Sequence, residues 1–270
     1  MTDLTTGAAE TVTLERSEGV ATVRLNRPEA LNSLDITTKE QLLAAVTGVA
    51  EDPDVRCVVL AGTGRAFCVG QDLKEHIGIL GSDDRDSLFT TVERHFNPVV
   101  TALATMPKPV VAAVNGVAAG AGASLAFACD LRVLADTAGF NLAFAGIALS
   151  CDTGSSWTLP RLVGQARALD LLYFPRTVDA EEALELGLAT QVVPGDQLEQ
   201  TVGALARRLA AGPTLAYGAI RRSLAFSAGH GLAESLALEA QMMTLTGASA
   251  DHAGAVAAFV AKQQPEFEGR

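Results

Sequence analysis

Two glycine-rich segments of the chain could bring backbone N–H groups to a ligand. Residues 64–74 read GRAFCVGQDLK and residues 114–124 read VNGVAAGAGAS, and each accompanies an apolar run that predicts a buried strand. Glycine has no Cβ, so the main chain beside it can approach a ligand closely. The second segment also opens a predicted helix, whose N-terminus favours negative charge. Two converging N–H donors would form an oxyanion hole, in which each donor stabilises a transition state by about 2.7–4 kcal/mol.

Neither segment is specific when it is taken alone. Close packing of the main chain is another common reason for glycines at such positions. Gly120 and Gly122 could belong to a dinucleotide-binding fingerprint, but Leu125 stands where that motif has its third glycine. The interpretation as an oxyanion hole therefore depends on what the rest of the chain places around these segments.

Strand and helix patterns alternate through the first part of the chain. A β-hairpin is predicted at residues 10–16 and 20–25, and buried strands are predicted at 56–61, 110–114 and 131–135. Helical spacing is found at residues 38–50, in an amphipathic stretch at 85–104, and from about residue 120. This alternation predicts a wound α/β fold with mostly parallel strands.

The character of the sequence changes after residue 195. The rest of the chain is rich in alanine and leucine, and it shows helical spacing at residues 198–211, 214–227, 231–245 and 252–262. We therefore predict a core formed by residues 1–195 and a C-terminal helical subdomain formed by residues 196–270. This subdomain should pack on the core or on a neighbouring subunit.

Composition and charge disfavour several classes of protein. The net charge of -11 argues against a nucleic-acid partner, which would need a basic face, so any phosphate of a ligand must be held by a few local cations and N–H groups. The apolar stretch at 109–129 is as long as a membrane span, but Asn115 and three glycines interrupt it. We predict a strand, a turn and a buried helix there, and no membrane association. The first ten residues show no export signal, which predicts a cytoplasmic protein.

The two glycine-rich segments resemble the paired oxyanion motifs of the crotonase (enoyl-CoA hydratase/isomerase) superfamily, in the same order. Four other blocks are also similar to that family: residues 25–34 (LNRPEALNSL), 150–164 (SCDTGSSWTLPRLVG), 180–188 (AEEALELGL) and 259–262 (FVAK). The resemblance covers about residues 12–265. It implies a crotonase-like spiral of repeated β-β-α units, with C-terminal helices that assemble a homotrimer or a hexamer formed by two trimers. It also implies an acyl-CoA substrate and no cofactor beyond the CoA of that substrate.

The resemblance assigns roles to individual residues. It implies that the backbone N–H groups of Gln71 and Ala121 bind the thioester oxygen, and that Asp72 holds its loop through hydrogen bonds. Lys262 stands where the family often has a lysine that reaches the CoA phosphates, although a solvated cation at a helix end is an equally good interpretation. The residues expected to line the CoA channel are Ala66, Gln71, Asp72, Leu73 and Lys74.

Departures from the family pattern bear on the reaction. Hydratases of this family use two glutamates, and Ser124 and Phe144 stand at those positions. Asp152 is the candidate replacement, because its Asp-Thr-Gly-Ser-Ser setting resembles phenylacetate-pathway enoyl-CoA isomerases, which use an aspartate here as a base. The setting also resembles 4-chlorobenzoyl-CoA dehalogenases, in which the aspartate is a nucleophile. From the residues alone, Asp152 could instead be a helix N-cap, and the two roles can coexist.

Moving a double bond needs only one base on one face of the substrate. The resemblance places Phe144, Leu149 and Trp157 beside Asp152, and burial among them would raise its pKa. Dehalogenation is less attractive, because it needs an aromatic cradle and a histidine, for which only His76 and His95 are candidates. The alternatives that remain are a hydratase with other catalytic groups, other thioester chemistry, and an acyl-CoA-binding homologue without catalysis.

Overall fold

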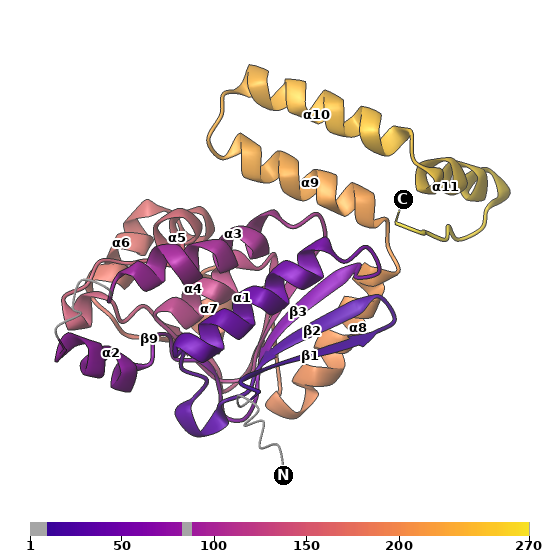
Figure 1. Cartoon of the computed structure of the whole chain (residues 1–270). Coiled ribbons are helices and arrows are strands. Elements are labelled where there is room, and N and C mark those ends of the chain that lie inside the picture. Colours follow the sequence, from indigo (N-terminus) through magenta and orange to yellow (C-terminus); the bar gives the residue numbers. More distant parts are fainter. Residues whose placement is uncertain (1–9, 83–87, 270) are drawn as a thin grey trace, which may run out of the picture.

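A six-stranded sheet lies at the centre of the computed structural model, which describes residues 10–82 and 88–269 (Figure 1). Its strands follow the order β1-β2-β3-β5-β7-β10, and only the β1–β2 pair is antiparallel. Every residue of β3 and β5 is buried, as their unbroken apolar sequences predict. The strand bounds are Val12–Ser17, Val20–Leu25, Cys57–Gly62, Val110–Val114, Leu131–Ala135 and Gln191–Val193.

A second, four-stranded sheet is built from three-residue strands. Its order is β4-β6-β8-β9, with bounds Ala66–Cys68, Val117–Ala119, Gly139–Asn141 and Thr177–Asp179. Each of the long strands β3, β5 and β7 is followed by one of these short strands, and β4 and β6 are each followed by a helix. The predicted α/β class with repeated β-β-α units is therefore confirmed. The strands β4 and β6 lie inside the glycine-rich segments and were not predicted, because three residues show no strand periodicity.

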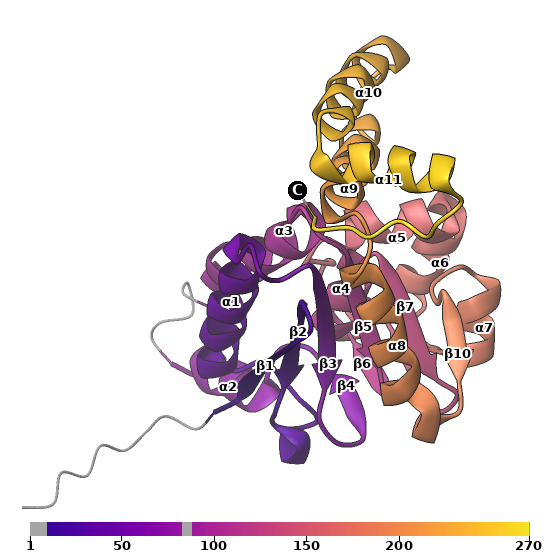
Figure 2. The same ribbon diagram turned by 90° about the vertical axis from the view of Figure 1, so that its right-hand side faces the viewer.

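Helices cover both faces of the large sheet. Figure 2 shows α1 (Ile36–Glu51) on one face and α8 (Leu198–Ala210) on the other. The amphipathic stretch expected at residues 85–104 contains α3 (Asn97–Thr105), which follows a short π-helical segment, and its residues 85–87 lie outside the described part of the chain. The remaining core helices are α2 (Leu73–Leu80), α4 (Ala121–Ala128), α5 (Ser155–Val163), α6 (Gln165–Tyr173) and α7 (Ala180–Glu185).

The apolar stretch at 109–129 folds as predicted. It forms the buried strand β5, the short strand β6 and the helix α4, whose eight residues are all buried. Among residues 10–82 and 88–269, no helix has the length and apolar character that crossing a membrane requires.

The first of the C-terminal helices, α8, packs on the core, although the predicted boundary at residue 196 places it in the helical subdomain. The apolar side chains of α8 belong to the main core, because Leu198, Val202 and Ala206 pack against the sheet. The part that stands apart from the core begins with α9 (Thr214–Ser227) and continues with α10 (Leu232–Gly247) and α11 (Ala250–Ala261) (Figure 1). Sequence composition could not separate α8 from these helices, since all four contain several alanines, and α8, α9 and α10 also contain leucines.

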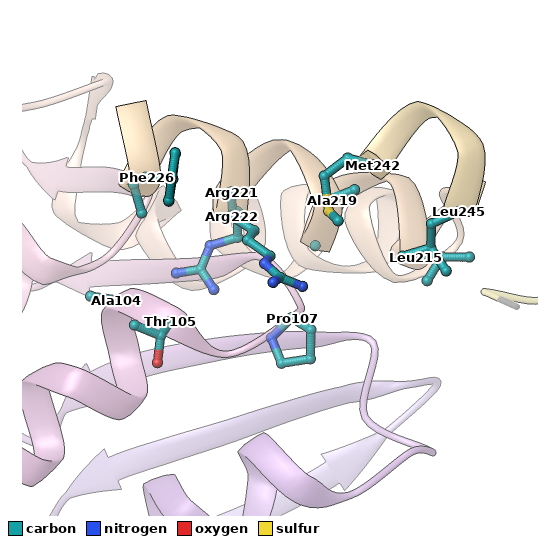
Figure 3. Close-up of a pocket in the computed structure, with 12 residues that line it drawn as sticks. Ala104, Thr105, Pro107, Leu215, Ala219, Arg221, Arg222, Phe226, Met242 and Leu245 are labelled. Atoms are coloured by element: carbon teal, nitrogen blue, oxygen red, sulfur yellow. The ribbon is translucent and has the colours of Figure 1, made fainter. Parts of the chain in front are cut away.

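Helix α9 is attached to the core by polar contacts of Arg221 and of Thr214, whose hydroxyl accepts from Arg56 at 3.0 Å. The guanidinium of Arg221 donates to the carbonyl oxygens of Leu103, Met106 and Lys108 and pairs with Asp130 at 2.8 Å. Figure 3 shows this arginine at a cavity of about 360 Å³ between the α9–α10 pair and the end of α3. None of the predicted site residues lines this cavity, so we place the site elsewhere.

Candidate active site

The two glycine-rich segments pack against each other, backbone to backbone. A Cβ placed on Gly70 would lie 2.9 Å from the oxygen of Ala119 and 3.2 Å from the nitrogen of Ala121. A Cβ placed on Gly122 would lie 2.1 Å from the oxygen of Cys68. Real Cβ atoms do not approach main-chain atoms so closely, so side chains at these positions would force the loops apart. The glycines are therefore what brings Gln71 and Ala121 together.

Both predicted oxyanion donors are free to bind a ligand. Leu34 donates to the oxygen of Gly70 and accepts from the nitrogen of Asp72, so the N–H of Gln71 between them faces the other way. Ala121 is the first residue of α4, where helix N–H groups have no partner within the helix. Within residues 10–82 and 88–269, neither N–H donates to another protein group. This arrangement can accept a negatively charged oxygen.

Asp72 holds the first loop in place, as expected. One carboxylate oxygen caps α2 by accepting from the nitrogens of Lys74 and Glu75, and the other accepts from Ser33 at 2.9 Å and Arg27 at 3.1 Å. Burial acts to raise the pKa of Asp72, but the hydrogen bonds from Ser33, Glu75, Arg27 and Lys74 outweigh it and lower the pKa. Asp72 therefore stays ionised and acts as a fixed anchor.

The side chain of Gln71 is held by two residues that the sequence analysis did not single out. Lys39 donates to its Oε1 at 3.1 Å, and its Nε2 donates to Glu75 at 3.0 Å. Lys39 and Glu75 also form an ion pair at 3.0 Å. A signal for Lys39 was present, because it falls on the buried face of α1 together with Leu42, Val46 and Val49. A lysine on such a face is rarely buried without a partner.

Asp152 has the environment of a reactive carboxyl group. Burial raises its pKa, and a 2.7 Å hydrogen bond from the Thr153 hydroxyl opposes that rise only in part. The predicted alternative, a helix N-cap, is wrong, because Gly154 occupies the cap position and no side chain caps α5. Thr153 has a positive φ of 53°, which is strained for a β-branched residue and is typical of functional loops.

Two buried serines connect the Asp152 loop to the oxyanion helix. The hydroxyls of Ser124 and Ser155 lie 2.5 Å apart, and both residues are fully buried. Ser124 stands one turn after Ala121 on α4, and the nitrogen of Ser155 donates to the carbonyl of Asp152. The bond therefore ties the segment that carries Asp152 to the first turn of α4. In the sequence, Ser124 stands out only as the residue that replaces a glutamate of the family's hydratases.

An apolar cavity of about 490 Å³ lies at the segment that precedes Asp152, which is itself not among the lining residues. Phe144, Leu149 and Cys151 line it together with residues of α5 and α6. Trp157, which is expected beside Asp152, is also not among the lining residues, is 43% exposed and stacks against Arg161 at 4.4 Å.

A second hollow, of about 520 Å³, lies beside the first loop. It is lined by four of the residues expected at the CoA channel, together with the cations Arg27 and Arg65; the four are Gln71, Asp72, Leu73 and Lys74. Arg27 is engaged with Asp35 and Asp72, whereas Arg65 and Lys74 are exposed.

Two of the expected CoA-binding residues lie apart from this hollow. Ala66 is buried, and its carbonyl already accepts from Asn32 and Asn115. Lys262 follows α11, at the opposite end of the molecule from α2 in both views (Figures 1 and 2). One protomer therefore does not bring Lys262 to the other predicted site residues.

The two candidate histidines differ in their surroundings. His95 lies behind the first loop, where its Nδ1 is 3.0 Å from the hydroxyl of Thr91, and burial and the nearby Lys39 charge lower its pKa. His76 packs edge-on against Phe89, at 6.3 Å between ring centres. Neither histidine has a described contact with Asp152, so the arrangement gives no support to a hydrolytic dehalogenation.

Comparisons with known proteins agree with this geometry. The model of the enoyl-CoA hydratase/isomerase family matches residues 15–270. The 1,2-epoxyphenylacetyl-CoA isomerase of Escherichia coli (strain K12) is 42% identical over 253 residues, which cover 94% of this chain and 96% of that protein. A probable enoyl-CoA hydratase of Rhodobacter capsulatus is 40% identical over 260 residues, covering 96% and 98%. The crystal structure of an enoyl-CoA hydratase/isomerase homologue from Mycobacterium abscessus superposes with a TM-score of 0.92 at 42% identity, covering 96% of this chain and all of that one.

Proposed function

The chain belongs to the enoyl-CoA hydratase/isomerase family, and we propose that it is an acyl-CoA isomerase in which Asp152 carries the proton. The observation that supports this most directly is the state of Asp152. Its pKa is raised by burial, its side chain does not serve as a helix cap, and its loop is tied to the oxyanion helix by the Ser124–Ser155 bond. A carboxyl group with a raised pKa is suited to accept and return a proton near neutral pH.

The proposed reaction has two proton transfers. The Asp152 carboxylate removes a proton from a carbon next to the thioester-activated system, and the C–H electron pair moves toward the thioester oxygen. The N–H groups of Gln71 and Ala121 stabilise the resulting enolate, each by about 2.7–4 kcal/mol. Asp152 then returns its proton to a different carbon. The chemistry needs no group beyond the protein and the CoA of the substrate.

A hydratase is the second candidate, and the positions of its usual carboxylates argue against it. Ser124 is fully buried, and its hydroxyl is occupied by Ser155 and by the carbonyl of Gly120. Phe144 is an apolar lining residue of the cavity at the segment that precedes Asp152. Adding water across a double bond needs one group to activate water and another to handle the α-carbon proton. Only Asp152 is available for these tasks among the residues expected at the site.

We propose that the CoA part of the substrate lies in the hollow lined by Gln71, Leu73 and Lys74. Arg65 and Lys74 are the exposed cations there, and they suit the CoA phosphates in a chain whose net charge is -11. The acyl part then passes the Gln71 and Ala121 donors and reaches Asp152 and the apolar cavity of about 490 Å³.

We propose that the protein is a homotrimer, alone or paired as a hexamer. The helices α9–α11 expose many large apolar side chains, among them Leu224 (68%), Leu232 (77%), Met243 (73%), Phe259 (82%) and Val260 (77%). An apolar surface of this kind usually marks a protein–protein interface. A neighbouring subunit would also let Lys262 reach a CoA phosphate that it cannot reach within its own protomer.

Isotope exchange tests the proposed function. 2-Enoyl-CoA and 3-enoyl-CoA are incubated in deuterated buffer with the unmodified protein, with Asp152→Asn, and with Asp196→Asn as a control at an exposed aspartate. We expect the unmodified protein and the control to move the double bond and incorporate deuterium, as followed by mass spectrometry and NMR. Asp152→Asn should do neither, while still binding the thioester.

Two results would contradict this function. If the unmodified protein binds acyl-CoA but exchanges no deuterium, the protein is a binder or uses covalent chemistry instead. If Asp152→Asn exchanges as fast as the unmodified protein, another group is the base. Accumulation of 3-hydroxyacyl-CoA by the unmodified protein would favour the hydratase.

A further inference from the structure

We propose that Lys39 is a positioning residue that aims the N–H of Gln71 at the thioester oxygen by clamping the Gln71 side chain together with Glu75. This inference rests on the proposed function only in assigning Gln71 to the oxyanion hole. The two residues that it adds, Lys39 and Glu75, have no contact with the substrate in the proposed function. Its subject is a buried ion pair behind the loop formed by residues 70–72.

The clamp holds both ends of one amide. The ammonium of Lys39 donates to Oε1 of Gln71 at 3.1 Å, and Nε2 of Gln71 donates to Glu75 at 3.0 Å. The Lys39–Glu75 ion pair, also 3.0 Å, closes the triangle. With both polar ends of the amide held, the Gln71 side chain keeps one rotamer. This also fixes the position of the Gln71 Cα, and therefore the direction of the N–H group bonded to it.

The same two residues connect the loop to rigid elements. Glu75 accepts from the nitrogen of Ile36 at 2.8 Å with its second oxygen, which joins the start of α1 to the first turn of α2. Lys39 lies in the first turn of α1 and over the ring of Phe96, 5.8 Å from its centre. The loop that carries Gln71 is therefore braced by two helix starts, which is what an oxyanion hole requires, because a displacement of about 1 Å can cost 10²-fold in rate.

Stability alone is a poor explanation for this ion pair. Lys39 is 2% exposed, and taking an ammonium out of water is so costly that a buried ion pair often stabilises a protein no better than apolar residues would. Its position against the donor residue of the site gives the buried charge a function. The chain also contains a matched lysine with a purely structural role.

That matched residue is Lys108. It is 4% exposed, and its ammonium donates to the carbonyls of Val49 and Asp52, at the opposite end of α1 from Lys39. Lys39 belongs to α1 and Lys108 to the segment between α3 and β5, and replacing either lysine by methionine removes a buried ammonium that contacts one end of α1. Only the replacement at position 39 releases the Gln71 side chain. Comparing the two variants therefore distinguishes the effect of lower stability from the effect of a misplaced Gln71.

The experiment reads the polarisation of a bound thioester directly. The probe is 4-(dimethylamino)cinnamoyl-CoA, whose absorbance shifts to longer wavelength when donors polarise its carbonyl, and no turnover is needed. The full-length proteins compared are the unmodified chain, Lys39→Met, Lys108→Met and Ala121→Pro. The last removes one donor N–H at the first position of α4, where proline is tolerated.

We expect a clear separation between the two lysines. Lys39→Met should lose most of the red shift, as Ala121→Pro does, while its dissociation constant for the probe changes little. It should also lower kcat by about 10- to 100-fold with little change in KM. Lys108→Met should keep the red shift of the unmodified protein, even if it melts at a lower temperature.

Other outcomes would overturn the inference. A full red shift in Lys39→Met, or an equal loss in Lys108→Met, would show that Lys39 contributes stability only. If Lys39→Met does not fold, Glu75→Gln provides the same test, because it releases Nε2 of Gln71 and breaks the ion pair; an unchanged shift in that variant overturns the inference. No shift in the unmodified protein would overturn the oxyanion hole itself, which is a failure of the proposed function and is recognised without any variant.

Discussion

Two aspartates occupy the two loops that meet at the start of α4, and their pKa values move in opposite directions. Asp72 follows the donor Gln71 and has a lowered pKa, whereas Asp152 precedes α5 and has a raised one. Burial pushes the pKa of both carboxyls upward. The difference comes from hydrogen bonds: the side chain of Asp72 accepts from Ser33, Arg27 and two backbone nitrogens, whereas that of Asp152 accepts from the Thr153 hydroxyl and from its own backbone N–H.

The comparison shows how two aspartates of one site can be suited to different tasks, one to hold a loop and the other to exchange a proton. A carboxylate that is fully bonded keeps its charge and fixes the backbone around it. A carboxylate with few donors is costly to keep charged, and it accepts a proton readily. In the proposed function, the first loop therefore supplies a backbone donor and uses its aspartate to hold that donor, and the second loop supplies the side chain that carries the proton.

Replacing Asp152 by Asn should give the largest effect and the clearest test of this contrast. We expect kcat to fall by about 10²–10⁴-fold, as for the loss of a general base. The melting temperature at pH 7 should rise. Because the pKa of Asp152 is raised in the folded state, the protonated form favours folding, and this contribution is lost as the pH rises through that pKa. The ionised carboxylate therefore destabilises the folded protein at pH 7, and the neutral amide of asparagine does not. Steady-state kinetics and thermal melts check both parts, and a lower melting temperature would show that Asp152 is a structural residue.

Replacing Asp72 by Ala should change stability in the opposite direction. The variant loses a helix cap and two side-chain hydrogen bonds to a charged group, so the free energy of unfolding should fall by about 2–3 kcal/mol at pH 7. With a folded pKa below its usual value of 3.8, Asp72 contributes stability that is present above pH 3.8 and lost as the pH falls through the lowered pKa. Urea unfolding at several pH values should therefore show the two proteins converging in acid. A constant difference at every pH would mean that the charge of Asp72 contributes nothing.

The sequence predicted the long elements of the fold. Unbroken apolar runs placed β3, β5 and β7, because that signal is local. The glycines indicated only that two loops could bring backbone N–H groups to a ligand, and the choice of Gln71 and Ala121 as donors came from the family resemblance and stays a prediction. The short strands β4 and β6 were missed, since three residues carry too little pattern to be recognised. The grouping of α8 with the core was also missed, because helices of the same composition can pack on a sheet or project from it.

The side-chain part of the site depends on contacts between distant residues. Lys39 and Gln71 are 32 residues apart, and Ser124 and Ser155 are 31 apart. No periodicity connects such positions, so the clamp and the serine pair could be found only in the folded chain.

The Ser124–Ser155 pair should have a smaller effect than either aspartate. We expect Ser124→Ala and Ser155→Ala each to reduce the free energy of unfolding by about 1 kcal/mol, the usual worth of one buried hydrogen bond. The double variant should cost less than the sum of the two, because the same bond is removed once. Urea unfolding of the four proteins completes the cycle, and additive losses would show that the two hydroxyls do not interact.

Replacing Thr153 should have the smallest effect of the four changes, because it alters only the pKa of Asp152. The hydroxyl of Thr153 gives Asp152 one of the hydrogen bonds that lower its pKa, so Thr153→Val should raise the pKa of Asp152 further. Since the base must be ionised, the acid limb of the kcat–pH profile should move to higher pH, and the plateau above it should change little. Thr153→Ser keeps the hydroxyl and should leave the limb in place. A limb that does not move in Thr153→Val would mean that a group other than Asp152 titrates in the reaction, and the contrast between the two aspartates would then describe structure without chemistry.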